Sequence, residues 1–127
     1  VMKIRVRLEQ YDLLEKTSSI LVETNAILKD NTLLYFEADG VHKHEIIFDD
    51  SEITLKRKGK QYSSNTVLPK HGAGEASVDS PYGMMKMDAR LVNMCRTNEK
   101  WSVEYKLFQG NETVTHMRMV WSFTLQA

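Results

Sequence analysis

The segment from Ser51 to Gly59 places an arginine where its alternation predicts an apolar residue. Ile53 and Leu55 mark one face of a predicted strand, and Arg57 falls on that same face. An arginine turned into a barrel is a prepared anion site, because its planar guanidinium grips a carboxylate or phosphate with two parallel hydrogen bonds. The alternative is structural: Arg57 lies at the strand end, extends past the rim, or pairs with an acidic neighbour. We favour the structural alternative.

Large side chains share the apolar phase of the later predicted strands, and small ones face them from an earlier strand. Dense packing of large against small explains this pattern, and we favour it. The same pattern also suits a cavity walled by adaptable methionines and polarised by a few polar groups. The large residues are Met85, Met87, Met117, Met119, Trp101, Tyr105, Trp121 and Phe123, and the small ones are Thr24 and Ala26. If a ligand binds, we predict that it contacts Arg57, Tyr105, Trp121, Thr24 and His44.

The remaining groups with reactive side chains give no complete site. His42 and His44 point the same way from one predicted strand, but a metal needs a third protein ligand, and nothing brings His71 or His116 to them. We therefore interpret the pair as a partly exposed strand face and expect no metal and no cofactor. Cys95 lacks the surroundings of a nucleophile, so we predict a small buried thiol.

Acidic residues gather where turns are predicted, which is their ordinary place, so we assign no acid–base pair. These residues are Glu37, Asp39, Asp49, Asp50 and Glu52. Glycine-rich phosphate loops and the hydrolase pattern Gly-x-Ser-x-Gly do not occur in the sequence. We predict no catalytic residue and regard an enzyme as the least favoured class.

The bulk composition restricts the class of protein. The 127 residues suffice for one domain, 1–127, with its own core. Seventeen basic and seventeen acidic residues give zero net charge, which disfavours a nucleic-acid partner. One cysteine agrees with a reducing compartment, and the charged start does not resemble a signal peptide. Because no run approaches the roughly 20 apolar residues of a spanning helix, we expect a cytoplasmic protein without a membrane partner.

Alternation of apolar and polar residues recurs along nearly the whole chain, with short turn signals between the segments. We therefore predict an all-β fold of about eight to ten antiparallel strands in meander order. A sandwich and a closed up-and-down barrel both fit, and closure favours the barrel because it removes exposed edges. The segment Glu9 to Lys16 is the best candidate for one or two helical turns, and strand boundaries within 60–80 are left open.

Five motifs, in order across the chain, resemble the DUF1934 or YwiB-like family of small bacterial proteins. They are KIRVRL, ETNAIL, ITLKRKG, SPYG and WSVEYKLFQGNETV. The resemblance implies a calycin-type, lipocalin-like β-barrel in a cytoplasmic setting, and it transfers no catalytic residue. It also implies that an arginine helps to close one end of the barrel.

Two classes of function remain ahead of an enzyme. The first is a binding module that holds a small amphiphilic anion, with its tail among the methionines and its head at Arg57. The second is a structural or interaction protein, with a packed core, whose outer face recruits a partner or a second copy as a homodimer. A lumen packed solid would exclude the first class.

Overall fold

The computed structural model describes residues 1–126, and all of its regular elements are strands. The strands are β1 (Met2–Asp12), β2 (Thr17–Lys29), β3 (Thr32–Phe36), β4 (Lys43–Phe48), β5 (Glu52–Lys58), β6 (Ser63–Pro69), β7 (Gly74–Ser80), β8 (Gly83–Arg96), β9 (Lys100–Gln109) and β10 (Glu112–Leu125). No helix in this described part of the chain is long and apolar enough to cross a membrane.

The ten strands form one closed antiparallel barrel in up-and-down order. Each strand pairs with the next along the chain, and β1 pairs with β10 to close the sheet, with Ile4 opposite Leu125 and Asp12 opposite Met117. The prediction of a closed barrel over a sandwich is confirmed, at the upper end of the expected strand number.

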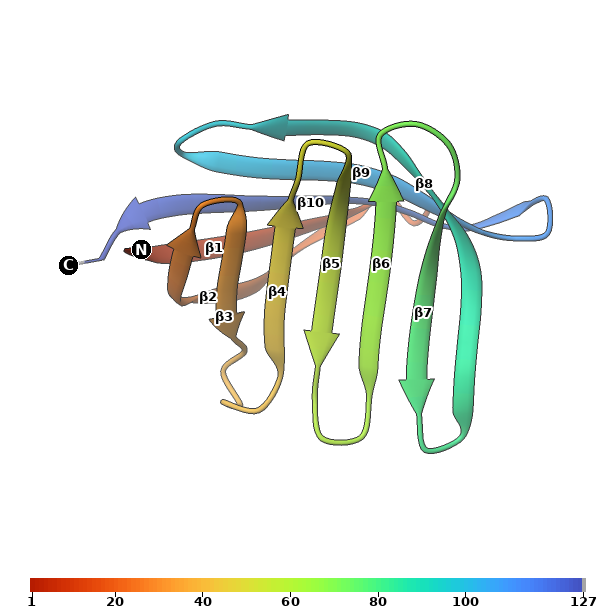
Figure 1. Cartoon of the computed structure of the whole chain (residues 1–127), viewed down its shortest axis with the longest axis horizontal. Helices are drawn as coiled ribbons and strands as arrows, with labels where there is room; N and C mark the ends of the chain where they lie inside the picture. Colours follow the sequence, from red (N-terminus) through yellow and green to blue (C-terminus); the bar gives the residue numbers. More distant parts are fainter. Residues whose placement is uncertain (127) are drawn as a thin grey trace.

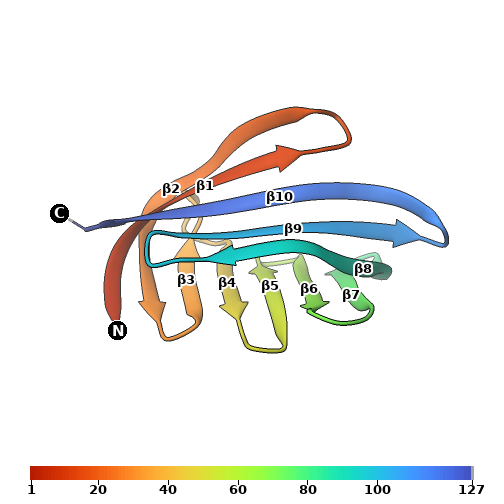
Figure 2. The same ribbon diagram turned by 90° about the horizontal axis from the view of Figure 1, so that it is seen from above.

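The barrel is flattened, so that two groups of strands cross one another (Figure 1). Strands β3 to β7 stand upright in that view, while β1, β9 and β10 run across behind them. The long strand β8 bends from one group into the other, and Figure 2 shows the same crossing from above. A register shift between Leu91 and Asn93 accompanies this bend, as expected of a β-bulge.

The core lies between the two groups of strands and is built from the inward phase of the alternation. In residues 1–126 every side chain of the buried class is apolar or aromatic. The largest fully buried side chains are Trp101, Trp121, Leu8, Leu33, Ile46, Ile53, Leu68, Val6 and Val103. Burial of side chains of this size supplies most of the driving force for folding.

An arginine closes the core at the end where the β8–β9 turn lies. Arg96, the last residue of β8, donates from Nη1 to the carbonyl oxygen of Phe48 at 3.1 Å and from Nη2 to that of Asp30 at 3.0 Å. Its guanidinium also lies 4.9 Å from the ring centroid of Trp101. Because Asp30 and Phe48 end neighbouring hairpins, one side chain joins three turns across this end.

Three local expectations were wrong: helical turns within Glu9 to Lys16, an inward Met85 and a buried Cys95. Glu9 to Asp12 continue β1, and the Asp12 carboxylate then accepts from the backbone N–H groups of Leu14 and Glu15 in a turn that ends at Lys16 with φ of 58°.

Met85 is 51% exposed, because it lies two residues from the β7–β8 turn, where the strands extend past the core. Cys95 is exposed as well. Its neighbour Met94 packs against the core, so the alternation turns the thiol outward. The segment 60–80, in which the sequence left the strand boundaries undecided, contains β6, which ends at Pro69, and β7.

Candidate functional site

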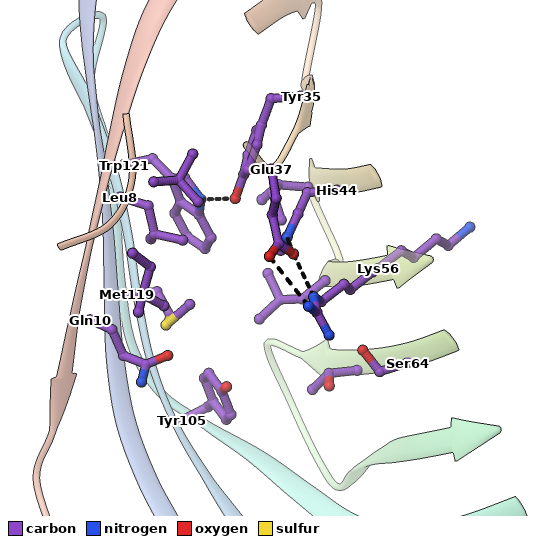
Figure 3. Close-up of a pocket in the computed structure, with 16 residues that line it drawn as sticks. Leu8, Gln10, Tyr35, Glu37, His44, Lys56, Ser64, Tyr105, Met119 and Trp121 are labelled. Atoms are coloured by element: carbon purple, nitrogen blue, oxygen red, sulfur yellow. Dashed lines mark hydrogen bonds and ion pairs between the residues drawn. The ribbon is translucent and has the colours of Figure 1, made fainter. Parts of the chain in front are cut away.

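The lumen of the barrel is not filled at the end away from Arg96. A cavity of about 440 Å³ lies there, within the size range of small-molecule sites. Its walls come from β1 to β6, β9 and β10 (Figure 3). The lining residues are Leu8, Gln10, Leu21, Val22, Tyr35, Glu37, His44, Ile46, Leu55, Lys56, Arg57, Ser64, Thr66, Tyr105, Met119 and Trp121.

Arg57 binds a carboxylate of the protein itself at this cavity. Its Nε donates to Glu37 Oε2 at 2.6 Å, and its Nη2 donates to Oε1 at 3.3 Å. His44 Nε2 lies 2.7 Å from the same Oε2. The side chains of Arg57, Glu37 and His44 are 45%, 26% and 15% exposed, so the cluster leads from solvent into the lumen. We call these three residues the polar cluster.

The strands bring the polar cluster together although its members are distant in sequence. His44 and Arg57 are direct partners in the β4–β5 register, and Glu37 follows the last residue of β3, beside β4. Partners opposite one another on antiparallel strands point to the same face. The inward direction predicted for Arg57 is therefore present, and so is the predicted pairing with an acidic neighbour.

The charges of the polar cluster follow from its contacts. The hydrogen bonds from Arg57 hold the pKa of Glu37 below its ordinary value, and Glu37 in turn raises the pKa of Arg57. Burial lowers the pKa of His44, and this effect outweighs the attraction of Glu37. At neutral pH the cluster thus holds one ion pair and an uncharged imidazole.

Two tyrosines present hydroxyl groups on different walls. The buried Tyr35 accepts a hydrogen bond from Trp121 Nε1 at 3.0 Å, and its ring stacks on His44 with 4.7 Å between centroids. Burial raises the pKa of Tyr35 and raises that of Tyr105 to about 12. Both phenols are protonated at neutral pH and can donate.

Four of the five residues predicted to contact a ligand line this one cavity: Arg57, His44, Tyr105 and Trp121. Thr24 does not, because it lines a separate surface hollow beside Asn25 and Phe36.

The prediction missed Glu37, which was assigned to a turn. The signal was present: Leu33 and Tyr35 are inward, and Glu37 continues their phase by one more step.

His42 and His44 are not a pair on one strand face. His42 precedes β4, and its Nδ1 contacts the Asp39 carboxylate, which also accepts from the backbone N–H groups of Val41 and His42. Ligand atoms of Glu37, Asp39 and His42 lie within 4.8 Å of one another. Both carboxylates already accept several hydrogen bonds within the protein, so we interpret these three residues as an anchor of the β3–β4 loop rather than as a metal site.

Comparisons with known proteins agree with this architecture. No curated protein sequence matches the chain. Among solved structures, the ywiB protein from Bacillus subtilis is similar with a TM-score of 0.71 and 12% sequence identity, over 99% of this chain and 93% of that one. At this identity the likeness concerns the fold alone. The model of the family described as "Domain of unknown function (DUF1934)" matches residues 4–120. The chain therefore belongs to the DUF1934 family, as its sequence motifs indicated.

Proposed function

We propose that this protein is a binding module that holds a small amphiphilic molecule in the lumen of its barrel. The observation that carries the proposal is the cavity of about 440 Å³, which combines apolar walls with one polar cluster at its mouth. A calycin-type carrier in the cytoplasm is the setting that we propose for this activity. The packed lumen that would have excluded a ligand is absent at this end in the described residues.

The apolar wall suits the tail of such a ligand. Leu8, Leu21, Leu55 and Met119 are among the residues that form it, from four different strands. Burying apolar surface of a ligand there is favourable at about 25 cal/mol per Å² before the costs of association. Met119 adds an unbranched, polarisable side chain that adapts to ligands of differing shape.

The experiment is native mass spectrometry of protein purified gently from its own cells, with two variants that form a matched pair. Ser64 lies opposite Arg57 in the β5–β6 register and lines the cavity, so Ser64→Phe fills the site (Figure 3). Ser63 is the adjacent residue and points to the other face, so Ser63→Phe adds the same ring outside the cavity.

We expect a bound small mass on wild type and on Ser63→Phe, and none on Ser64→Phe. A bound mass retained by Ser64→Phe contradicts the proposal. It is also contradicted if wild-type protein carries no bound mass and does not increase the fluorescence of 1-anilinonaphthalene-8-sulfonate in a titration. Thermal melts of all three proteins establish that the comparison is made between folded barrels.

A second candidate function is protein interaction through the β7–β8 turn. Tyr82, Met84 and Met85 expose large apolar side chains there, away from the cavity. Met84 and Met85 are adjacent in β8 and point to opposite faces of the strand, so the turn exposes apolar groups on both sides. Large exposed apolar side chains can mark a site of association, including homodimers. Light scattering of wild type and Tyr82→Ser tests this candidate: a strictly monomeric wild type without a co-purifying partner ends it.

A further inference from the structure

We infer that the ligand's head group is a carboxylate. The end of the Arg57 guanidinium binds this carboxylate, while Glu37 binds the side of the guanidinium. This inference rests on the proposed function and specifies the chemical class that the cavity recognises. It follows from which hydrogen-bonding atoms of the cavity lining the protein already uses and which it leaves without a partner.

Arg57 has hydrogen-bonding capacity left after its pairing with Glu37. A guanidinium carries five N–H donors, and Glu37 takes the edge formed by Nε and Nη2. Among residues 1–126 no group accepts a hydrogen bond from Nη1. The end of the fork, made by Nη1 and the second hydrogen of Nη2, thus has the geometry for a second carboxylate. Glu37 holds the guanidinium in place and so reduces the entropy lost on binding.

Beyond the polar cluster and Lys56, the polar groups of the lining can all donate a hydrogen bond; they are Gln10, Tyr35, Ser64, Thr66 and Tyr105. Tyr35 accepts from Trp121, which leaves its own proton to donate, and the Tyr105 hydroxyl has no hydrogen-bond partner in the described chain. Glu37 is the one carboxylate in the lining, and both of its oxygens are engaged. The hydroxyls and the amide can also accept, but the free N–H groups of Arg57 can only donate. A head group that accepts hydrogen bonds therefore pairs with all of these groups, whereas a head group that only donates leaves Arg57 unpaired, which is costly in a partly buried site.

The local charge also distinguishes the possible head groups. The polar cluster is close to neutral, and Lys56, the other cation in the lining, extends away from the cavity (Figure 3) and lies 3.7 Å from Glu45. A cationic head would have to take Glu37 from Arg57 and His44. A doubly charged head would face the Glu37 carboxylate at short range, where repulsion is strong. A monoanion such as a carboxylate meets the one free guanidinium edge, leaves Glu37 in its pairing and is repelled by Glu37 less strongly than a dianion.

The test compares probes with one tail and different heads. Decanoate, decyl phosphate, decanol and decyltrimethylammonium are titrated into the whole protein below their micelle concentrations, by calorimetry. We expect decanoate to bind at least about tenfold more tightly than decanol and the ammonium probe, which equals about 1.4 kcal/mol. We expect decyl phosphate, as the dianion, to bind less tightly than decanoate.

Two variants that remove the same charge provide the control. Arg57→Gln should abolish the preference for decanoate, whereas Lys58→Gln, on the next residue of β5, should keep it. Arg57→Lys keeps the charge without the planar fork and should lose most of the preference for decanoate. A thermal melt of this variant that matches that of wild type shows that it is folded.

The outcomes separate this inference from the function on which it rests. If no probe binds, decanol included, the binding function itself fails. If decanol binds as tightly as decanoate, the tail site stands and the carboxylate assignment is wrong. Preference for the ammonium probe or for decyl phosphate also overturns the assignment, in favour of Glu37 or of a phosphate head respectively.

Discussion

Two arginines occupy opposite ends of this barrel, and they are used differently. Arg96 donates to two backbone carbonyls and stacks on Trp101, so its hydrogen bonds tie turns together over a filled core. Arg57 donates to the side-chain carboxylate of Glu37 beside an open lumen and retains free N–H groups among the described residues. The resemblance implied that an arginine closes one end, and Arg96 has that geometry. The comparison teaches that an arginine's role follows from what accepts its hydrogen bonds.

The cores behind the two arginines differ in the same way. Behind Arg96, Phe48 and Trp101 lie 4.7 Å apart between ring centroids, Trp101 and Phe123 lie 5.6 Å apart, and Phe48 meets Trp121 edge-on at 6.4 Å. Aromatic clusters of this kind bury much surface and leave little room. Behind Arg57 the walls are more mixed, with aliphatic, aromatic and polar side chains, and they enclose a cavity. We therefore assign stability to the first end, and the second is the end at which we propose binding.

The largest expected effect comes from breaking the filled end. Trp101→Ala should lower the free energy of unfolding by about 3–5 kcal/mol, because it removes a fully buried ring and leaves a cavity. Tyr82→Ala, which removes an exposed ring, should stay within about 0.5 kcal/mol of wild type. Urea denaturation measures both values, and a similar loss for the two variants would refute the assignment of stability to this end.

The two arginines themselves should separate in the same measurement. Arg96→Ala should cost about 1–2 kcal/mol, because bonds from a charged donor to backbone carbonyls are lost and the carbonyls lose a partner. Arg57→Ala should cost about 1 kcal/mol or less, because the ion pair is nearly half exposed on the arginine side. Equal losses would remove the distinction between a closing and a binding arginine.

Trp121 contacts both regions, because it packs on Phe48 at the filled end and also lines the cavity. Trp121→Phe keeps most of the ring but removes the hydrogen bond to Tyr35, which should cost about 1 kcal/mol. Because Tyr35 stacks on His44, we also expect weaker binding of decanoate. Tyr35→Phe removes the same hydrogen bond from the other side, and a double-mutant cycle isolates its contribution. Additive losses would show that the bond contributes nothing.

The smallest expected effect is a dependence of stability on pH that belongs to the open end. The pKa values of His44 and Glu37 are both lowered in the folded protein, so the unfolded chain binds more protons than the folded one. The stability from His44 is complete above its ordinary value of 6.5 and is lost as the pH falls below it. The stability from Glu37 is complete above 4.5 and is lost below that value.

Thermal melts between pH 7.5 and 3 should therefore show falling stability. His44→Gln should flatten the first part of this curve and Glu37→Gln the second. Arg96→Ala, at the other end, should shift the whole curve without changing its slope. A wild-type curve that is flat from pH 7.5 to 5 would show that His44 is not desolvated as described.

The sequence predicts the barrel well because alternation is a local property that each strand displays by itself. The segments Lys3 to Glu9 and Met117 to Leu125 show it without knowledge of their partners, and their pairing follows from closure. Arg57 was placed correctly for the same reason. The surroundings of Arg57 required more, because Glu37 is 20 residues away and follows a strand end where acidic residues normally serve turns.

The residues that the sequence misplaced lie where alternation is interrupted or runs past the core. The register shift between Leu91 and Asn93 changes which residues of β8 face inward, and this change determines the positions of Cys95 and Arg96. Met85 keeps its phase but lies beyond the packed part of the strand. A cavity is also invisible to a pattern of apolar and polar residues, since the same large and small side chains can fill a lumen or line it.

Closure of the sheet by β1 and β10 has a consequence for how the chain folds during synthesis. The ribosome makes β1 first, with its inward side chains Ile4, Val6 and Leu8, and it makes β10, which pairs with β1 to close the sheet, last. Until β10 leaves the ribosome, one edge of β1 and the growing edge of the sheet stay open to other chains. Such late long-range pairing slows folding. The interval before closure is thus the time when this protein is most exposed to aggregation.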